Sequence, residues 1–322
     1  MPSFVDDAIV AGLVRTVEEA AIASASTIGL GDRKRADRVA VRAMRRVLDT
    51  VPVRGRVVIG EGERDRAPML WSGEEFGCGG RDAPPVDIAV DPLEGTNLCA
   101  TDAPGAIAVL AAAPRGGLLQ APDLYMDKIV VGPAAAPRIG GGIRLDHDPA
   151  RNLAAIAEAE DCPVASLTVV ILERSRHERL IAATRAAGAR VRLIGDGDLS
   201  AGLLAATPGS GVHAVMGSGG APEGVITAAA LRCLGGGMLG RLVVRNESER
   251  ARIRETGVRD ADRVMDAREM ASADALLVCA TGVTDGALVG GVRATRFGIE
   301  TSTLLLRTAP EERTRITRLR RG

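Results

Sequence analysis

The sequence predicts an α/β protein built from two packed lobes. Its 322 residues are more than one hydrophobic core usually holds, which favours two lobes. Residues 167–172 and 191–194 have the pattern of strands, and each is followed by a helical pattern, at 178–187 and 199–206. Because strands that alternate with helices at this spacing form parallel βα units, we expect a parallel sheet with ligands at the carboxyl ends of its strands.

The chain begins with two predicted helices and a strand. Residues 6–26 carry apolar side chains at helical spacing, and glycines at 29 and 31 end that pattern. A second helix is predicted from Asp37 to Leu48, so locally Asp37 is interpreted as a carboxylate stabilised at a helix N-terminus. A short strand follows at 56–59.

The middle of the chain alternates short strands and turns. A strand at 86–90 should stop near Asp91, because Pro92 cannot donate to a ladder. Further strands are expected at 107–110 and 129–131, around a turn at 115–117. The glycines at 140–142 suggest a lobe boundary or a mobile loop, and we divide the chain into lobes 1–163 and 164–322.

The last third contains a glycine-rich stretch between a strand and a helix. We expect a strand at 214–216, a loop at 217–224 that could present N–H groups to phosphate, and a helix through Leu234. As a dinucleotide-binding loop it is a poor match, because Glu223 would lie beside the pyrophosphate; Glu223 better suits a metal ligand or a helix cap. Strands are expected at 275–280 and, as the final one, at 301–307.

Composition excludes several classes of partner and location. Lysine plus arginine and aspartate plus glutamate both number 41, so the net charge favours neither nucleic acid nor an anionic membrane. The basic segment 313–321 is interpreted as a solvated terminus, with an acidic partner as the alternative. No apolar run is long enough to span a bilayer, the N-terminus lacks a signal-peptide profile, and five scattered cysteines suggest reduced thiols. We therefore expect a cytoplasmic protein.

Two acidic turns at strand ends are the candidate metal site. Asp91 and Glu94 lie three residues apart at the end of a predicted strand, where their charges would repel unless one is protonated or a cation lies between them. Oxygen ligands suit Mg²⁺ or Mn²⁺, Gly95 lets a ligand approach the backbone, and Thr96 adds a hydroxyl. An acidic surface turn is the alternative.

The second acidic turn follows the strand at 56–59. It carries Glu61, Glu63 and Asp65, which could equally belong to a solvated surface loop. Its repetition of acids at a strand exit favours a site for two metal ions, since such a site needs several carboxylate donors.

These segments resemble a known family. Residues 91–96, Asp-Pro-Leu-Glu-Gly-Thr, resemble the Asp-Pro-Ile/Leu-Asp-Gly-Thr signature of the lithium-sensitive, metal-dependent sugar and inositol phosphatases. Further strings resemble one branch, the bacterial class II fructose-1,6-bisphosphatases of the GlpX type, and they occur in order at residues 59–63, 65, 67–70, 125–128, 174–177, 196–198, 219–224 and 280–286.

The resemblance implies a fold, a ligand set and a substrate site. The fold is a layered αβαβα sandwich of two intimately packed lobes, usually a homodimer or homotetramer, with metal ligands in the first lobe and the sugar phosphate in the second. The implied metal ligands are Asp37, Glu61, Asp91, Glu94 and Glu223. The implied substrate-binding residues are Glu94, Gly95, Thr96, Tyr125, Arg174, Ser175, Arg176, Asp196, Gly197, Asp198 and Gly220.

The implied reaction is direct hydrolysis of the 1-phosphate of fructose 1,6-bisphosphate, a step of gluconeogenesis that yields fructose 6-phosphate. Divalent ions at the carboxylates, Glu61 among them, would acidify a water and neutralise phosphate oxygens for in-line attack. Thr96 and Asp65 could position or deprotonate that water. Arg174 and Arg176 can grip the second phosphate, while Asp196 and Asp198 would accept bonds from sugar hydroxyls.

Three departures from the family pattern bear on the substrate. Arg33 stands where a lysine is usual, unless Lys34 shifts into that place, Arg64 and Arg66 flank Asp65, and Arg174 replaces a frequent lysine. The added charge could suit sedoheptulose 1,7-bisphosphate or a specialised sugar phosphate. A catalytically silent sugar-phosphate sensor and, more distantly, an oxidoreductase using the glycine loop remain alternatives.

Overall fold

The computed structural model describes residues 6–61, 69–256, 258 and 260–321, and it confirms the predicted α/β class. The chain forms two compact units, one of Met1–Leu119 with Ser272–Gly322 and one of Gln120–Ala271. This division differs from the expected cut after residue 163, because the chain leaves the first unit and later returns to it. The glycines at 140–142 consequently lie inside the second unit. That one lobe holds metal and the other the sugar phosphate stays a prediction.

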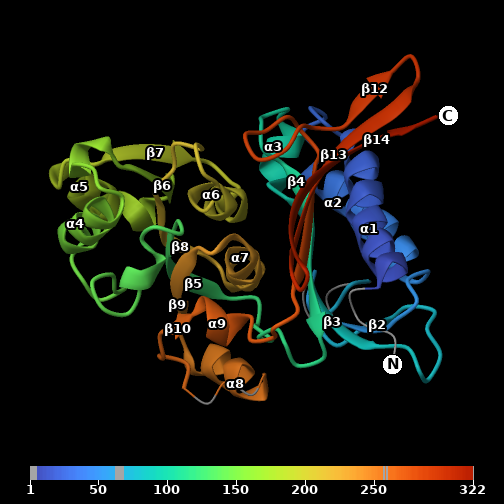
Figure 1. The fold of residues 1–322 in the computed structure, drawn as a ribbon, viewed down its shortest axis with the longest axis horizontal. Coiled ribbons are helices and arrows are strands. Elements are labelled where there is room, and N and C mark those ends of the chain that lie inside the picture. Colours follow the sequence, from blue (N-terminus) through green and yellow to red (C-terminus); the bar gives the residue numbers. More distant parts are fainter. Residues whose placement is uncertain (1–5, 62–68, 257, 259, 322) are drawn as a thin grey trace. The chain divides into compact units, whose positions relative to one another are not determined.

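The first unit contains a mixed sheet with two long helices on one face (Figure 1). Its strand order is β12-β13-β11-β4-β3-β1-β2, with β14 pairing on β13. The strands are β1 (Arg54–Ile59), β2 (Glu75–Phe76), β3 (Pro85–Glu94), β4 (Ile107–Pro114), β11 (Leu277–Gly282), β12 (Arg293–Thr295), β13 (Gly298–Thr308) and β14 (Glu311–Arg320).

The two helices agree with the sequence pattern except for one start point. Helix α1 (Asp7–Ala25) is confirmed and buries its apolar face against the sheet. Helix α2 (Arg33–Leu48) begins four residues before the predicted start, because Asp32 caps it by accepting a hydrogen bond from the Arg35 N–H. Asp37 is therefore inside the helix and is not its cap.

Strand β3 continues past the predicted end. Its pairing with β4 joins Asp91 to Val109 and then Glu94 to Ile107, so the register shifts between these pairs. Such a bulge lets Pro92 remain in the strand without donating to the ladder. The expectation that the strand stops near Asp91 is wrong, and the bulge instead keeps Asp91 and Glu94 on one strand end.

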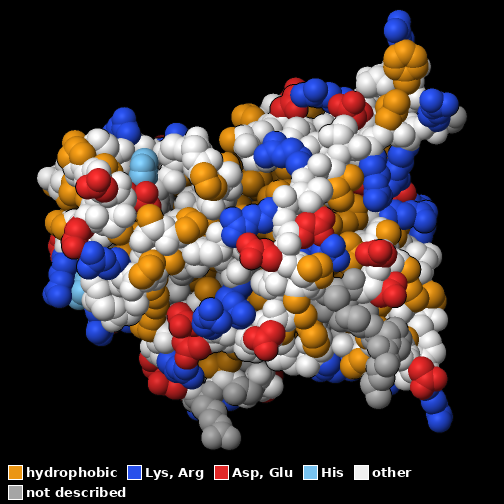
Figure 2. Space-filling view, in the orientation of Figure 1, with side chains coloured by type: hydrophobic (Ala, Val, Ile, Leu, Met, Phe, Trp, Pro, Cys, Tyr) orange, Lys and Arg blue, Asp and Glu red, His pale blue; other side chains and the backbone are white. Residues whose placement is uncertain are grey.

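The C-terminal basic segment is not a solvated tail. Residues 311–320 form strand β14, which pairs along its length with β13, so the predicted strand at 301–307 is not the final one. The hairpin between β12 and β13 carries exposed apolar side chains beside arginines (Figure 2), with the Arg296 guanidinium 4.5 Å from the ring centre of Phe297.

The second unit contains a six-stranded mixed sheet in the order β10-β9-β5-β8-β6-β7. Strands β7, β6 and β8 are parallel, which confirms the predicted βα units. Helix α4 packs on one face of the sheet, α6 contacts β5, β6 and β8, and α7 contacts β5, β8 and β9. The elements are β5 (Tyr125–Val131), α4 (Pro149–Ala159), β6 (Thr168–Leu172), α5 (Glu178–Ala186), β7 (Arg190–Ile194), α6 (Asp198–Ala205), β8 (Ala214–Gly220), α7 (Ala221–Leu234), β9 (Gly237–Val243), α8 (Glu247–Glu255), β10 (Met265–Asp266) and α9 (Ala267–Met270).

The predicted glycine loop at 217–224 is mostly strand and helix. Strand β8 runs to Gly220 and pairs antiparallel with β5, and α7 starts at the next residue. The glycines are needed because side chains approach the strand closely: an added Cβ at Gly217 would lie 2.9 Å from Nε2 of His177. The expectation of a loop between strand and helix is therefore wrong.

Within the described part of the chain, no helix combines the length and the apolar character that crossing a bilayer requires.

Candidate active site

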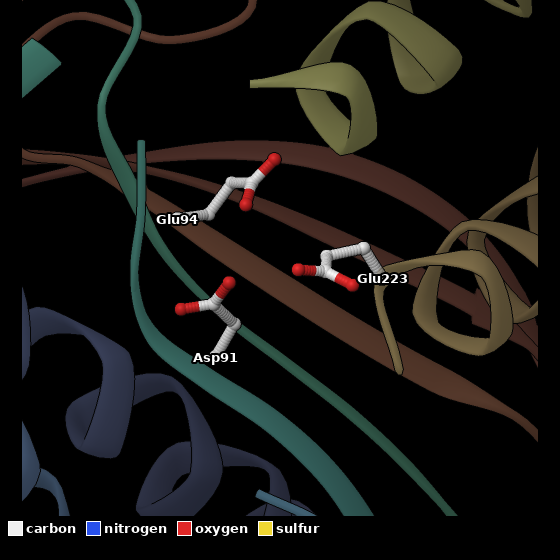
Figure 3. A group of neighbouring side chains, drawn as sticks. All are labelled: Asp91, Glu94 and Glu223. Carbon is white, nitrogen blue, oxygen red and sulfur yellow. The ribbon is translucent and has the colours of Figure 1, made fainter. Parts of the chain in front are cut away.

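Asp91 and Glu94 bring two carboxylates together at the end of β3. Figure 3 shows both side chains on this strand, and each offers an oxygen within 4.8 Å of the other. Glu94 is 5% exposed and Asp91 is half-buried, with its Oδ1 accepting a hydrogen bond from the Leu93 N–H at 3.0 Å. Two carboxylates this close repel each other, and carboxylate oxygens are donors that hard divalent cations prefer. The pair therefore fits a divalent metal ion.

A third acid on the same strand has a structural role. Asp87 is fully buried and accepts two hydrogen bonds from Arg56, at 3.0 and 2.8 Å, and one from the Gly116 N–H at 2.7 Å. Its charge is thus matched by a guanidinium on the neighbouring strand β1. The three acidic residues of β3 therefore have different roles: Asp87 stabilises the sheet, and only Asp91 and Glu94 belong to the candidate site.

Gly95 and Thr96 turn the chain from β3 into the short helix α3 (Thr96–Ala100). Gly95 has φ of 79°, a left-handed conformation that favours glycine. The Thr96 hydroxyl donates to the Leu93 carbonyl at 3.0 Å, so its oxygen lone pairs are left to accept a hydrogen bond. The predicted partner Asp65 lies outside the described residues.

Asp37 and Glu61 are not part of the 4.8 Å group that contains Asp91 and Glu94. Burial raises the pKa of Asp37, and the neighbouring Arg38 opposes this. Glu61 follows β1 and donates its backbone N–H to the Leu70 carbonyl at 2.9 Å. Four metal ligands are predicted in the first unit, and the structure brings two of them, Asp91 and Glu94, within 4.8 Å of each other.

The unusual Arg33 has a partner in the same region. Its Nη1 donates to Oδ1 of Asn97 at 2.8 Å, which joins the start of α2 to α3 directly after Thr96. Arg64 and Arg66, the other departures near the acidic turn, lie outside the described residues.

In the second unit, Glu223 lies in the first turn of α7, and Figure 3 also draws it. Burial raises its pKa, nearby Lys128 opposes this, and Asp198 and Asp123 add to it. Its Oε2 is buried without a hydrogen-bond partner among the described residues. A Cβ added at Gly220 would lie 1.7 Å from that oxygen, so glycine is required for the carboxylate to lie against the end of β8.

Asp196, Gly197 and Asp198 form the turn from β7 into α6. Gly197 has φ of 85° and donates its N–H to Oδ1 of Asp196 at 3.1 Å. Asp198, the first residue of α6, pairs with Lys128 of β5, whose Nζ lies 2.6 Å from Oδ2. The sequence motifs that carried the resemblance included Lys128, but its pairing with Asp198 was not predicted, although a lysine directly before the apolar residues 129–131 of a strand was a signal.

Tyr125 begins β5 and is approached by two guanidinium groups. Arg176 lies 4.7 Å and Arg245 4.6 Å from the centre of its ring. Guanidinium groups stack favourably on aromatic faces, so the ring holds two positive charges close together. Arg245 was not among the predicted residues, because it lies outside every string that carried the resemblance.

The predicted phosphate-gripping arginines contact backbone carbonyls in this structure. Arg174 donates to the carbonyls of Glu173 and Gly195, at 2.9 and 2.7 Å, and Ser175 beside it is exposed. Arg176 donates to the Ser218 carbonyl through Nε and Nη2. The arginines therefore join the ends of β6, β7 and β8, and their contact with phosphate stays a prediction.

His177, next to them, has a structural role. It is buried, its Nε2 accepts the Ser218 N–H at 2.8 Å, and its Nδ1 lies 2.8 Å from the Leu172 carbonyl. Both bonds are satisfied when Nδ1 carries the proton and the ring is neutral.

A cavity of about 480 Å³ opens beside Arg176 within the second unit. Arg176 is the only predicted substrate residue in its wall, which also contains Asp127, Ser218 and Arg241. The cavity leaves space for a ligand group next to the Arg176 guanidinium.

Comparison with known proteins identifies the family. A family profile described as "Bacterial fructose-1,6-bisphosphatase, glpX-encoded" matches residues 7–320. The chain belongs to this family. Membership of the glpX-encoded fructose-1,6-bisphosphatases confirms the resemblance seen in the sequence strings, and it covers nearly the whole chain.

Three curated relatives are similar to this chain over most of its length, and all are named D-fructose 1,6-bisphosphatase class 2/sedoheptulose 1,7-bisphosphatase. The protein of Synechococcus sp. strain JA-3-3Ab is 49% identical over 316 residues, covering 91% of this chain and 90% of the relative. That of Synechococcus elongatus is 47% identical over 317 residues, with the same coverage. That of Prochlorococcus marinus strain NATL1A is 43% identical over 316 residues, covering 94% of this chain and 93% of the relative.

Proposed function

We propose that this protein is a phosphoric monoester hydrolase that removes the 1-phosphate of fructose 1,6-bisphosphate with the help of a divalent metal ion. The family match over residues 7–320 supports the reaction class, as do the names of the relatives. The observation that carries the proposal is the pair of carboxylates at Asp91 and Glu94, placed by the β3 bulge on a chain of this family.

The metal-holding residues in this proposal are Asp91 and Glu94, joined by Asp37, Glu61 and Glu223. Their carboxylates are the oxygen donors that Mg²⁺ and Mn²⁺ prefer, and the orphaned Oε2 of Glu223 fits such a role. A bound divalent ion supplies activation of water and neutralisation of phosphate oxygens. Measuring phosphate release with each ion in turn distinguishes between Mg²⁺ and Mn²⁺.

Thr96 positions the attacking water in our proposal. Its hydroxyl hydrogen already points to the Leu93 carbonyl, so the oxygen can accept a hydrogen bond from water and hold it for in-line attack. Asp65 is proposed to receive the proton that this water loses, and Glu61 to assist. The turn at Gly95 lets the phosphate group approach the backbone at the same place.

The remaining substrate contacts are assigned to the second unit and to Glu94. We propose that Arg174, Ser175 and Arg176 bind the second phosphate, exchanging backbone carbonyls for phosphate oxygens, and that Tyr125 lies beside them. Asp196 and Asp198 accept bonds from sugar hydroxyls, and Gly197 and Gly220 permit close approach of the sugar.

Sedoheptulose 1,7-bisphosphate is a second candidate substrate. The names of the relatives, which combine both activities, favour it. The two sugars differ by one carbon between their phosphates, so the same carboxylates and arginines could serve both.

Assembly as a homodimer or homotetramer and a cytoplasmic location are also part of the proposal. The first rests on the family resemblance, and the second on the five cysteines, which are scattered along the chain as reduced thiols usually are. Native mass spectrometry tests the first, and fractionation of the producing cell tests the second.

Phosphate release from purified protein tests the function. Fructose 1,6-bisphosphate, sedoheptulose 1,7-bisphosphate and a panel of sugar monophosphates are supplied with Mg²⁺ or Mn²⁺, with and without a chelator. We expect metal-dependent release from the bisphosphates that the chelator abolishes. No release from either bisphosphate, combined with tight binding of a sugar phosphate, would favour the sensor; binding of NADH would favour the oxidoreductase.

A further inference from the structure

Lys128 lies inside the second unit with 5% of its side chain exposed. Lysine is rarely so buried unless negative or polar groups surround its ammonium. Here Nζ lies 2.6 Å from Oδ2 of Asp198 and donates to the Gly220 carbonyl at 3.1 Å. A single ammonium therefore joins strand β5, the first residue of α6 and the residue before α7.

Each of these segments carries a proposed substrate residue. Tyr125 lies on β5 three residues before Lys128 and pairs across the sheet with Gly220, and Asp198 belongs to the turn that begins at Asp196. The ammonium holds Oδ2 of Asp198, and the carboxylate has a second oxygen, Oδ1. That oxygen is the one available to a sugar hydroxyl.

The choice of lysine at this position is informative. Lys34 and Lys128 are the only lysines among the 41 basic residues of the chain, and Lys34 is exposed. The space around Nζ is small, since a Cβ added at Gly219 would lie 3.0 Å from Nζ and 2.1 Å from Oδ2 of Asp198. A compact ammonium fits there, whereas a planar guanidinium is larger and needs a wider set of acceptors.

We propose that Lys128 is a positioning residue for the sugar phosphate. It orients Asp198 toward a sugar hydroxyl and fixes Gly220 beside it, so it contributes to substrate affinity through Asp198 and does not contact the reacting phosphate. This inference rests on the proposed function and deepens it.

A double-mutant cycle tests the connection between the two residues. Lys128→Met, Asp198→Asn and the double variant are compared with wild type by KM and kcat on fructose 1,6-bisphosphate, and by calorimetric binding of fructose 6-phosphate without metal. We expect each single variant to raise KM and Kd about tenfold or more, with kcat within about threefold of wild type. The double variant should bind within about twofold of the weaker single variant, because the second change removes nothing further.

Two other variants separate positioning from general destabilisation. Gly219→Ala keeps both charges but pushes into the contact between them, and we expect the same rise in KM. Arg138→Met removes an ion pair of equal length, 2.6 Å to Glu158, elsewhere in the second unit, and should leave KM unchanged. Thermal unfolding of every variant confirms that the measured protein is folded. If Lys128→Met does not fold, the KM values of Gly219→Ala and Asp198→Asn test the proposal instead.

Several outcomes would overturn the inference. The first is a KM equal to that of wild type in Lys128→Met or in Gly219→Ala. The second is a double variant in which the increases in KM and Kd caused by Lys128→Met and Asp198→Asn multiply. Full recovery of affinity in Lys128→Arg would contradict the argument from space. If the wild-type protein binds fructose 6-phosphate but releases no phosphate, the proposed function fails while the cycle on Kd still tests Lys128. A wild-type protein that binds no sugar phosphate overturns both.

Discussion

Nη1 of Arg318 lies 3.0 Å from Oε2 of Glu18, and this ion pair joins the last strand of the chain to its first helix. Nη2 of Arg320 reaches the same oxygen at 3.0 Å, and Glu18 is fully buried. A carboxylate so buried needs its partners, because removing them leaves a charge without compensation. The basic residues near the C-terminus thus stabilise the first unit.

Replacing both arginines should destabilise the protein more than either change alone. With Arg318→Met or Arg320→Met the other guanidinium still pairs with Glu18, so we expect losses of roughly 1 kcal/mol each, since both arginines are partly exposed to solvent. The double variant should lose about 3 kcal/mol or more. Urea unfolding measures this, and Arg313→Met, an exposed residue of β14, serves as the control. Simple additivity of the two single changes would contradict the shared role of Glu18.

Glu94→Gln should abolish metal-dependent turnover while the fold persists. The amide keeps the shape of the side chain but removes the charge beside Asp91, so we expect kcat/KM to fall by at least about 10²-fold. Phosphate release and metal titration measure the effect, and circular dichroism checks the fold. Glu75→Gln, at an exposed position of β2, should retain activity. Wild-type rates in Glu94→Gln would refute the ligand assignment.

Thr96→Val should lower kcat with metal binding largely retained. The variant keeps the branched shape but loses the oxygen that holds water in our proposal, and we expect a loss of about 10²-fold or more. Thr96→Ser keeps the hydroxyl and is the matched control, expected to lie within about tenfold of wild type. A rise in KM with kcat unchanged would argue against a role in positioning water.

Gly220→Ala should inactivate the protein through Glu223. The added Cβ would lie 1.7 Å from Oε2 of Glu223, so the carboxylate must move away from the end of β8. We expect a higher metal concentration for half-maximal activity and a lower maximal rate, measured by Mn²⁺ titration. Gly141→Ala adds the same methyl where the nearest atom is 3.9 Å away and should have no effect. Equal behaviour of the two variants would contradict the argument.

Elements with regular periodicity could be predicted from the sequence. Helix α1, the strands β6 and β7, and residues 214–216 of β8 have apolar residues at the spacing of their secondary structure, and the structure has these elements at the predicted places. The candidate pair Asp91 and Glu94 could also be predicted from the sequence, because the two carboxylates are only three positions apart along the chain.

Glycine-rich strands were misread or missed for a physical reason. Strand β9 contains Gly237 and Gly240, and β8 ends in Gly219 and Gly220, which locally indicate loops. They belong to strands because side chains from other elements fill the space: a Cβ at Gly240 would lie 2.5 Å from Sδ of Met126. Local sequence contains no information on such close approach.

Contacts between distant residues were the other limit. Lys128 and Asp198 are 70 positions apart, and Arg318 and Glu18 are 300 apart, so neither partner could be identified from spacing along the chain. Arg318 and Arg320 of β14 were interpreted as solvated charges, because their acidic partners Glu18 and Glu19 lie on α1, far away in the sequence.

The division of the first unit between the two ends of the chain determines the order in which it can be completed. Strand β4 pairs with β11, so Ile107 meets Gly282 only after the entire second unit has been synthesised. During synthesis on the ribosome, the whole inserted unit emerges before β11, so one side of β4 remains unpaired until then. We therefore expect a truncated chain that ends before residue 277 to expose that side of β4 to other chains and to aggregate more readily than the full chain.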